Sequence, residues 1–165
     1  MIKRLNDMRG FTLVELLVYM ALLAVFLIVL TDIFVSILDV QSESQATSAT
    51  EQDGRFILSR LAYDIPQATS IITPASLGQT ENFLEIDVSG TTYRYDLASN
   101  NLQLDDGTGT NTLNSSETTV PSISFQRIGN AGGKDTIRIQ FDIQSVAERP
   151  SGPETRSFTT TVGRR

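Results

Sequence analysis

An unbroken apolar run near the N-terminus constrains this chain more than any other feature. It extends from Phe11 to Leu30 and reads FTLVELLVYMALLAVFLIVL. Twenty residues are what a helix needs to cross the ~30 Å hydrocarbon core of a bilayer. Basic residues precede the run at Lys3, Arg4 and Arg9. This bias predicts that the N-terminus stays in the cytoplasm and that the large polar remainder lies outside.

Two ordinary explanations account for part of this pattern. A secretory signal peptide has a shorter apolar region with a small-residue cleavage site after it, whereas no A-x-A sequence follows this run. A plain signal anchor accounts for the length and the basic flank, but not for Glu15, a carboxylate inside the run. Such a carboxylate is costly in a membrane unless it is paired, so Glu15 indicates a function. The nearest cation would be a free amine on Phe11, released by a cut before that residue.

The segment GFTLVELLV, residues 10–18, resembles the processing motif of type IV prepilins and type II secretion pseudopilins. In that family a membrane aspartyl peptidase cuts after the glycine and methylates the new N-terminal amine. The resemblance implies a cleavage site between Gly10 and Phe11, removal of a leader formed by residues 1–10, and N-methylation of Phe11. It also implies that Glu15 neutralises this amine during assembly, in its own subunit or in a neighbour.

The resemblance implies partners and a location as well. The partners are other pilin or pseudopilin subunits, the prepilin peptidase, the assembly platform with its motor ATPase, and membrane lipid before assembly. The protein would cross the cytoplasmic membrane once, with its head outside, and would then enter an extracytoplasmic filament. Major pilins usually carry a proline where this chain has Asp32, which directs the resemblance toward minor members.

Apolar residues at helical spacing continue beyond the run. They recur between Ile33 and Leu38 and again between Ile57 and Ile65. Pro66 then predicts the end of the helix, because proline lacks the N–H that the helix needs. We therefore expect one helix over residues 11–65.

This helix should have two parts with different surroundings. Residues 11–31 form the segment that crosses a membrane or fills a filament core. Residues 32–65 extend the helix and pack on the head. The polar stretch from Ser42 to Asp53 and the following Gly54 predict where the helix would bend or fray.

A second, looser resemblance lies in the extension. Residues 53–65 and the following Gln67–Ala68 are similar to the J-type minor pseudopilins and related minor pilins, and Phe158–Arg164 is similar to their closing strand. An alternative stays open, because Arg60 and Asp64 are one helical turn apart and could form a simple surface pair.

After Pro66 the apolar period changes to two, which is typical of strands. Residues 66–165 are therefore predicted to form an antiparallel meander packed on the helix, and the fold class is α+β and pilin-like. Turns are expected at Ser89–Gly90 and Asn100–Asn101, and a long loop over residues 105–119. Ile137, Ile139, Phe141 and Ile143 are predicted to point inward. Other strands place residues on one face or carry them at this period, namely Leu84, Ile86, Val88, Tyr93, Tyr95, Leu97, Leu102, Leu104, Ile123, Phe125, Phe158, Thr160 and Val162.

Composition removes several kinds of chemistry. The chain has no cysteine and no histidine, which excludes thiol catalysis, a histidine triad and zinc sites built on either residue. A net charge of −6, with no Lys/Arg cluster in the head, gives no support for nucleic-acid binding. We therefore expect a structural protein with no catalytic, metal or cofactor site.

Three short patterns in the head partly match ligand sites. Asp105–Gly107 offers oxygens as a calcium loop does, but the EF-hand spacing is missing and a polar turn is expected. Gly132–Lys134 lacks the earlier glycine and the Ser/Thr of a phosphate loop. Glu85 and Asp87 share one strand face, where a solvated pair is expected rather than a glycosidase site.

Other function classes remain as alternatives. A signal-anchored binding module would keep its N-terminus uncut and would tolerate Glu15→Leu. A membrane-anchored hydrolase would need a nucleophile site that the sequence does not offer. Secretion, DNA uptake, adhesion and twitching use similar subunits, so the sequence leaves the system open.

Overall fold

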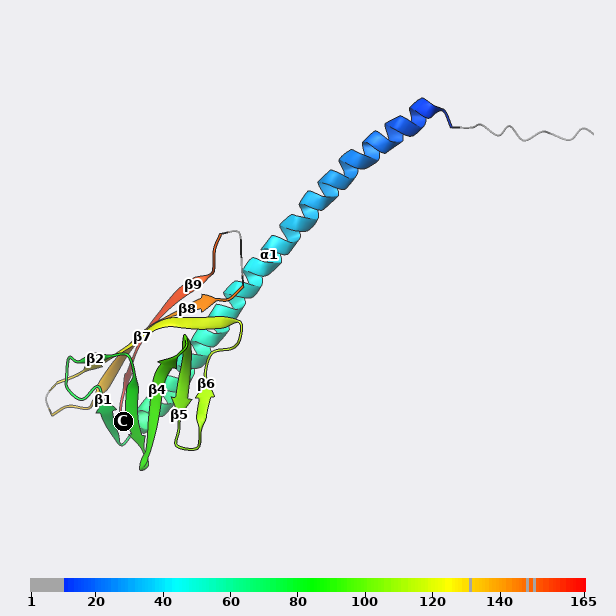
Figure 1. Ribbon diagram of the computed structural model, residues 1–165. Coiled ribbons are helices and arrows are strands. Elements are labelled where there is room, and N and C mark those ends of the chain that lie inside the picture. The colour runs from blue at the N-terminus through cyan, green and yellow to red at the C-terminus, as the bar shows by residue number, and fades with distance from the viewer. Residues whose placement is uncertain (1–10, 131, 148, 150) are drawn as a thin grey trace, which may run out of the picture. The chain divides into compact units, whose positions relative to one another are not determined.

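One long helix, α1 (Leu13–Gln67), precedes the strands in this computed structural model (Figure 1). The structure describes residues 11–130, 132–147, 149 and 151–165. The chain divides into two compact units, one ending at Val40 and the other running from Gln41 to Arg165. In the first unit, every described residue of α1 is exposed.

The helix ends differ from the predicted ones by two residues at each end. Helix α1 begins at Leu13 because Thr12 acts as its N-cap: the Thr12 hydroxyl accepts the Glu15 N–H at 3.2 Å. At the other end Pro66 lies inside the last turn, and the helix closes when the Ala68 N–H donates to the Ile65 carbonyl at 3.2 Å. The proline weakens the last turn without ending the helix before it.

The head contains two antiparallel sheets. The first has the order β1 (Ser70–Thr73), β3 (Leu84–Val88), β4 (Thr91–Ala98), β5 (Asn101–Asp105) and β6 (Thr110–Thr112). The second has the order β2 (Thr80–Glu81), β7 (Thr118–Ile128), β8 (Thr136–Ser145) and β9 (Thr155–Gly163). The predicted α+β class is confirmed. The division into two sheets was not predicted, because strand periodicity does not say which strands pair.

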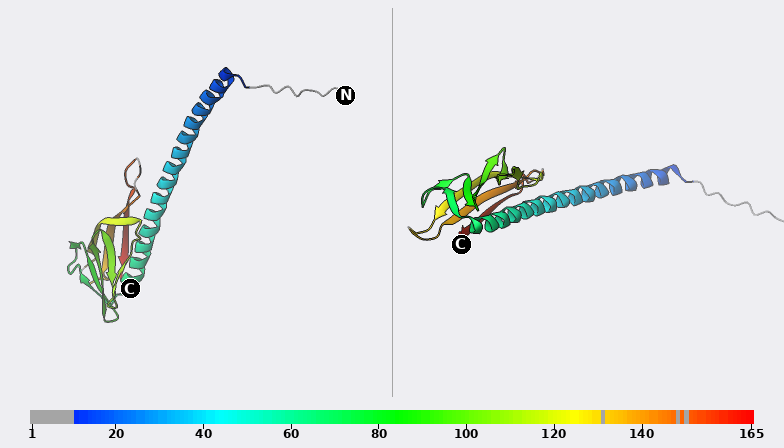
Figure 2. Two further views of the ribbon diagram at one scale, coloured as in Figure 1. Left: turned by 45° about the vertical axis from the view of Figure 1, so that its right-hand side comes forward. Right: turned by 90° about the horizontal axis from the view of Figure 1, so that it is seen from below.

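A shared core holds the two sheets to the second part of α1. Figure 2 shows the strands of the head lying beside this part of the helix. Helix side chains Ile57, Leu61 and Ile65 are fully buried in it. Most of the strand positions named from the sequence are buried with them, including Leu84, Ile86, Tyr95, Leu102, Leu104, Ile123, Phe125, Ile137, Ile139, Phe141 and Ile143. The period-two pattern therefore identified the core face of each long strand correctly.

The two predicted hairpin turns have different outcomes. The turn at Ser89–Gly90 is confirmed, with φ of 56° and 87°. The other turn falls on Ser99–Asn100, with φ of 51° and 60°, and not on Asn100–Asn101. Two-residue hairpin loops of this type need positive φ at both central residues, and pairing of Ala98 with Asn101 fixes the frame.

Gly54 does not interrupt the helix, so the predicted fraying there is wrong. Helix α1 continues through it, and Gly54 is buried. A Cβ built on Gly54 would lie 2.2 Å from Cζ of Phe158 in β9. Gly54 is thus needed because the Phe158 ring packs directly on the helix backbone.

Candidate functional site

Two predicted site residues, Phe11 and Glu15, lie four positions apart at the start of α1. Thr12 caps the helix and Glu15 stands at the third helical position, the Thr-x-x-Glu spacing of a capping box. The Glu15 carboxylate also lies at the positive end of the helix dipole, which favours a negative charge there. Gly10 lies outside the described residues, so the cleavage site between Gly10 and Phe11 stays a prediction.

Tyr19 contacts both Phe11 and Glu15, and the sequence analysis did not identify it. Its hydroxyl donates to Glu15 Oε1 at 3.3 Å. Its ring packs edge to face with Phe11, with centroids 6.1 Å apart and an interplanar angle of 71°. The available signal was the spacing of four residues between Glu15 and Tyr19, which brings two side chains onto the same helix face. Phe11, Glu15 and Tyr19 therefore form one cluster, which we call the N-terminal cluster.

The helix that carries this cluster exposes a long apolar surface. Among the described residues, α1 is the one helix that is long and apolar enough to cross a membrane. Side chains such as Leu16, Leu23, Phe26 and Ile33 are more than half exposed. A surface of this extent needs an apolar partner, either lipid or other helices. An anchoring role in a membrane is consistent with this composition.

Two carboxylates of α1 are buried in the head and were not predicted to be. Asp64 pairs with Arg60, whose Nε lies 2.7 Å from Asp64 Oδ2, but Asp64 is only 3% exposed. The fully buried Tyr95 donates its hydroxyl to the same carboxylate. Burial raises the pKa of Tyr95, and the hydrogen bond to Asp64 raises it further, so the phenol stays protonated. The predicted pair of Arg60 and Asp64 is therefore present, but Asp64 is buried and only Arg60 lies near the surface.

Asp53 is the second buried carboxylate, at 8% exposure. It accepts the backbone N–H and the hydroxyl of Ser115, both at 2.8 Å, and the hydroxyl of Thr118. The predicted long loop over residues 105–119 is thus fixed to α1, and it also contains β6. Both carboxylates orient α1 on the head, because each accepts hydrogen bonds from specific groups of the head instead of from water.

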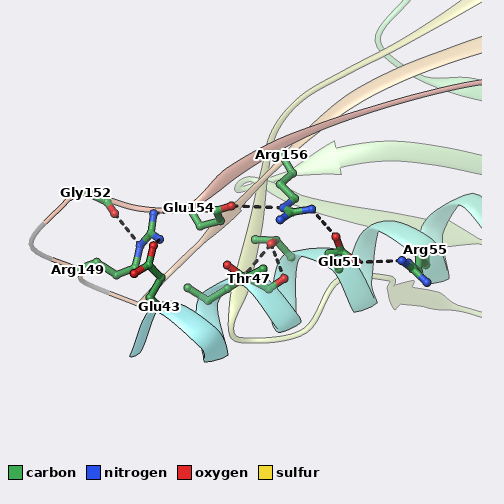
Figure 3. Close-up of polar contacts among 10 residues, drawn as sticks. Glu43, Thr47, Glu51, Arg55, Arg149, Gly152, Glu154 and Arg156 are labelled. Atoms are coloured by element: carbon green, nitrogen blue, oxygen red, sulfur yellow. Dashed lines mark hydrogen bonds and ion pairs between the residues drawn. The ribbon is translucent and has the colours of Figure 1, made fainter. Parts of the chain in front are cut away.

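A chain of ion pairs fixes the β8–β9 connection to α1 (Figure 3). Arg156 bridges Glu51 of the helix and Glu154, the latter at 3.3 Å. Arg149 in turn contacts Glu154 at 3.0 Å and Glu43 of the helix at 3.7 Å. A network of this kind holds its members more firmly than isolated surface pairs do. It aligns the start of β9 with the helix.

Two of the three patterns that partly match ligand sites make local contacts within the head. The Asp105 carboxylate accepts the Gly107 N–H at 2.9 Å, and Asp106 accepts the Thr108 N–H at 3.0 Å, which makes a polar turn. Glu85 pairs with Arg94 at 2.6 Å. Within the described part of the chain, no group of three Asp or Glu residues is arranged to hold a metal ion.

Comparison with known proteins identifies one feature. A family profile described as "Prokaryotic N-terminal methylation motif" matches residues 5–31. Searches of curated proteins and of solved structures found no match. The matched segment contains the N-terminal cluster and the first turns of the exposed apolar helix. Together with the α+β fold it supports a type IV pilin-like protein, and the motif is one of structural subunits rather than enzymes.

Proposed function

We propose that this chain is a structural subunit, a minor pilin or pseudopilin, of a type IV pilus-like or type II secretion-like filament. One observation carries the proposal: a methylation motif at residues 5–31 covers the start of an exposed apolar helix, where Glu15 of the helix and the preceding Phe11 share one cluster. A signal anchor needs the apolar helix but has no use for Glu15.

The mechanism begins with processing. A prepilin peptidase cuts between Gly10 and Phe11, removes residues 1–10 and methylates the Phe11 amine. The new ammonium lies at the positive end of the helix dipole, where it is unfavourable in an apolar medium. The Glu15 carboxylate neutralises it, and Tyr19 holds that carboxylate by its hydroxyl. The helix then moves from lipid into the filament core and exchanges lipid contacts for contacts with other helices.

The finer assignment concerns the kind of subunit. The J-type minor pseudopilins and related minor pilins are the members that residues 53–68 resemble. Such a subunit crosses the cytoplasmic membrane with its head outside and then joins an extracytoplasmic filament. Its partners are other subunits, the peptidase, and an assembly platform with its motor ATPase.

The experiment replaces Glu15 by Val in the full chain. Insertion and cleavage should persist, since the spanning run becomes more apolar. Incorporation into filaments should fall sharply, because an ammonium buried without a partner costs several kcal/mol. The measurement is the ratio of variant to wild type in sheared filaments, with membrane levels matched.

Two further variants act as controls. Glu15→Gln keeps the size of the side chain but loses its charge, so it should behave like Glu15→Val. Thr31→Val also makes the apolar helix more apolar, and the Thr31 hydroxyl bonds only to the Leu27 carbonyl among the described residues, so incorporation should be unchanged. Normal incorporation of Glu15→Val would show that Glu15 does not guide assembly, whereas an N-terminus that is never cut would favour the signal-anchored binding module.

A further inference from the structure

The edges of the two sheets in the head are unequal. Three of the four edge strands are short. Strand β2 has two residues, β6 has three, and β1 has four with a register shift between Ile71 and Thr73. The fourth edge is β9, with nine residues and regular pairing to β8 (Figure 1). Short or irregular strands are the usual protection of a sheet edge. Strand β9 lacks it.

The direction of each backbone group of β9 follows from two bonds at its ends. The Ser145 N–H donates to the Glu154 carbonyl at 2.8 Å, and the Arg164 N–H donates to the Asp135 carbonyl at 2.9 Å. In an antiparallel ladder these bonds recur at every second residue. Even-numbered residues of β9 therefore face β8, and odd-numbered ones direct their N–H and C=O groups away from it.

The outward-facing residues share three properties. All of them are exposed, all have short uncharged side chains or none, and none has a backbone hydrogen bond to any described residue. They are Thr155, Ser157, Thr159, Thr161 and Gly163. Gly163 has no side chain, so its exposure is that of the backbone itself. Helix α1 meets β9 through even-numbered side chains, Arg156 and Phe158. The helix thus covers one face of the strand. It reaches the outward side only past the end of β9, where the Arg165 N–H donates to the Pro66 carbonyl, and the odd-numbered residues from Thr155 to Gly163 stay exposed.

We propose that this open edge of β9 binds an extended segment of a different protein, which adds to the sheet as an antiparallel strand. Donors and acceptors that alternate along β9, about 6.8 Å apart for like groups, match only another extended backbone. No proline interrupts β9, and no charge lies between Ser157 and Gly163. The edge therefore offers nothing that repels such a strand.

A second copy of this chain fits the edge less well. Strand β9 runs in the same direction as the second part of α1, since Arg156 contacts Glu51 and the Arg165 N–H bonds to the Pro66 carbonyl. Antiparallel pairing of two copies would point their helices in opposite directions. Copies anchored by α1 in one membrane, as proposed above, all point the same way. Only this choice of partner rests on the proposed function; the open edge does not.

The test uses the full chain in its host cell, with the photoreactive residue p-benzoylphenylalanine in place of Ser157. Illumination should give an adduct with a protein of different sequence. Thr159→Pro should reduce the adduct at least about tenfold, because it removes an outward N–H without breaking any bond to β8. Thr159→Ala, which keeps that N–H, should leave the adduct unchanged. Thr161→Pro is a second variant of the same kind, in case the first fails to fold.

The outcomes separate edge pairing from other contacts. Resistance to proteolysis shows whether each variant is folded, and a photoreactive residue at Gln140, on the exposed face of β8, reports contacts unrelated to the edge. Equal adduct yields for proline and alanine at Thr159 would overturn the proposal. So would an adduct with a second copy only, or yields no higher than those from Gln140. The Glu15 variants leave this readout unaffected, so the two proposals fail separately.

Discussion

Replacing Gly54 by Ala tests the packing of α1 on the head through the sign of its effect. In an exposed helix this change stabilises by about 1 kcal/mol, because alanine has the higher helix propensity. Here the added Cβ would lie 2.2 Å from Cζ and 2.4 Å from Cε2 of Phe158. Carbon atoms pack at about 3.5–4.0 Å, so the ring would have to move by more than an ångström. Phe158 is stacked on Phe141, with centroids 5.3 Å apart, and this stacking opposes the movement.

The magnitude follows from these two effects. Overpacking of a well-filled core costs about 1–3 kcal/mol, and a contact this short belongs at the upper end of that range. Subtracting about 1 kcal/mol of helix propensity leaves a net destabilisation of about 1–2 kcal/mol. For a head of this size, the thermal midpoint should fall by roughly 4–10 °C.

The assay is thermal unfolding of the full chain in detergent, followed by near-ultraviolet circular dichroism of the head. Phe158→Leu is the matched partner variant, since it shortens the side chain that the new Cβ meets. On that background Gly54→Ala should cost less or become stabilising, and the difference is the coupling energy of the pair. A higher midpoint for Gly54→Ala in the otherwise unchanged chain would refute the reasoning.

Two further predictions concern carboxylates of the head. Asp64→Ala should lower the free energy of unfolding by about 2–3 kcal/mol in denaturant unfolding, because the buried Tyr95 hydroxyl loses its acceptor. Tyr95→Phe should cost only about 1 kcal/mol, and equal costs for the two variants would contradict this reasoning. The hydroxyls of Ser157 and Ser122 bond to the Asp142 carboxylate and lower its pKa below the ordinary 3.8. These bonds therefore stabilise the folded state fully above pH 3.8, and this stabilisation is lost as the pH falls through the lower folded-state pKa of Asp142. Ser157→Ala should therefore cost about 0.2–1 kcal/mol near pH 6 and progressively less as the pH falls below 3.8, and a cost that does not change with pH would show that the bond has another role.

Local patterns were enough to predict the elements of this fold. The apolar run from Phe11 and the stripe ending at Ile65 have helical spacing, and the head strands alternate with a period of two. Both signals depend only on neighbouring residues, so the helix and the core faces of β3, β4 and β8 were predicted closely. The short strands β1, β2 and β6 were missed, because two to four residues are too few to show a period.

The contacts between distant segments could not be predicted. Gly54 was interpreted from its helix propensity, but the residue that requires it is Phe158, far along the chain. Asp64 has the spacing of an ordinary surface pair with Arg60, and only the position of Tyr95 in β4 makes it a buried acceptor. In the candidate site, Phe11 and Glu15 lie close in sequence, so they could be singled out without knowing the fold, and their roles stay predictions. Tyr19 was visible by the same spacing rule and was overlooked.

The most direct test of the central claim is the intact mass of the protein extracted from host membranes that contain a prepilin peptidase. Our account predicts a chain that begins at Phe11 and carries a methyl group on its amine. Gly10→Glu should instead give the full-length precursor, because a bulky charged side chain blocks approach to the bond. A wild-type mass that still includes residues 1–10 would contradict the assignment of this chain as a processed filament subunit.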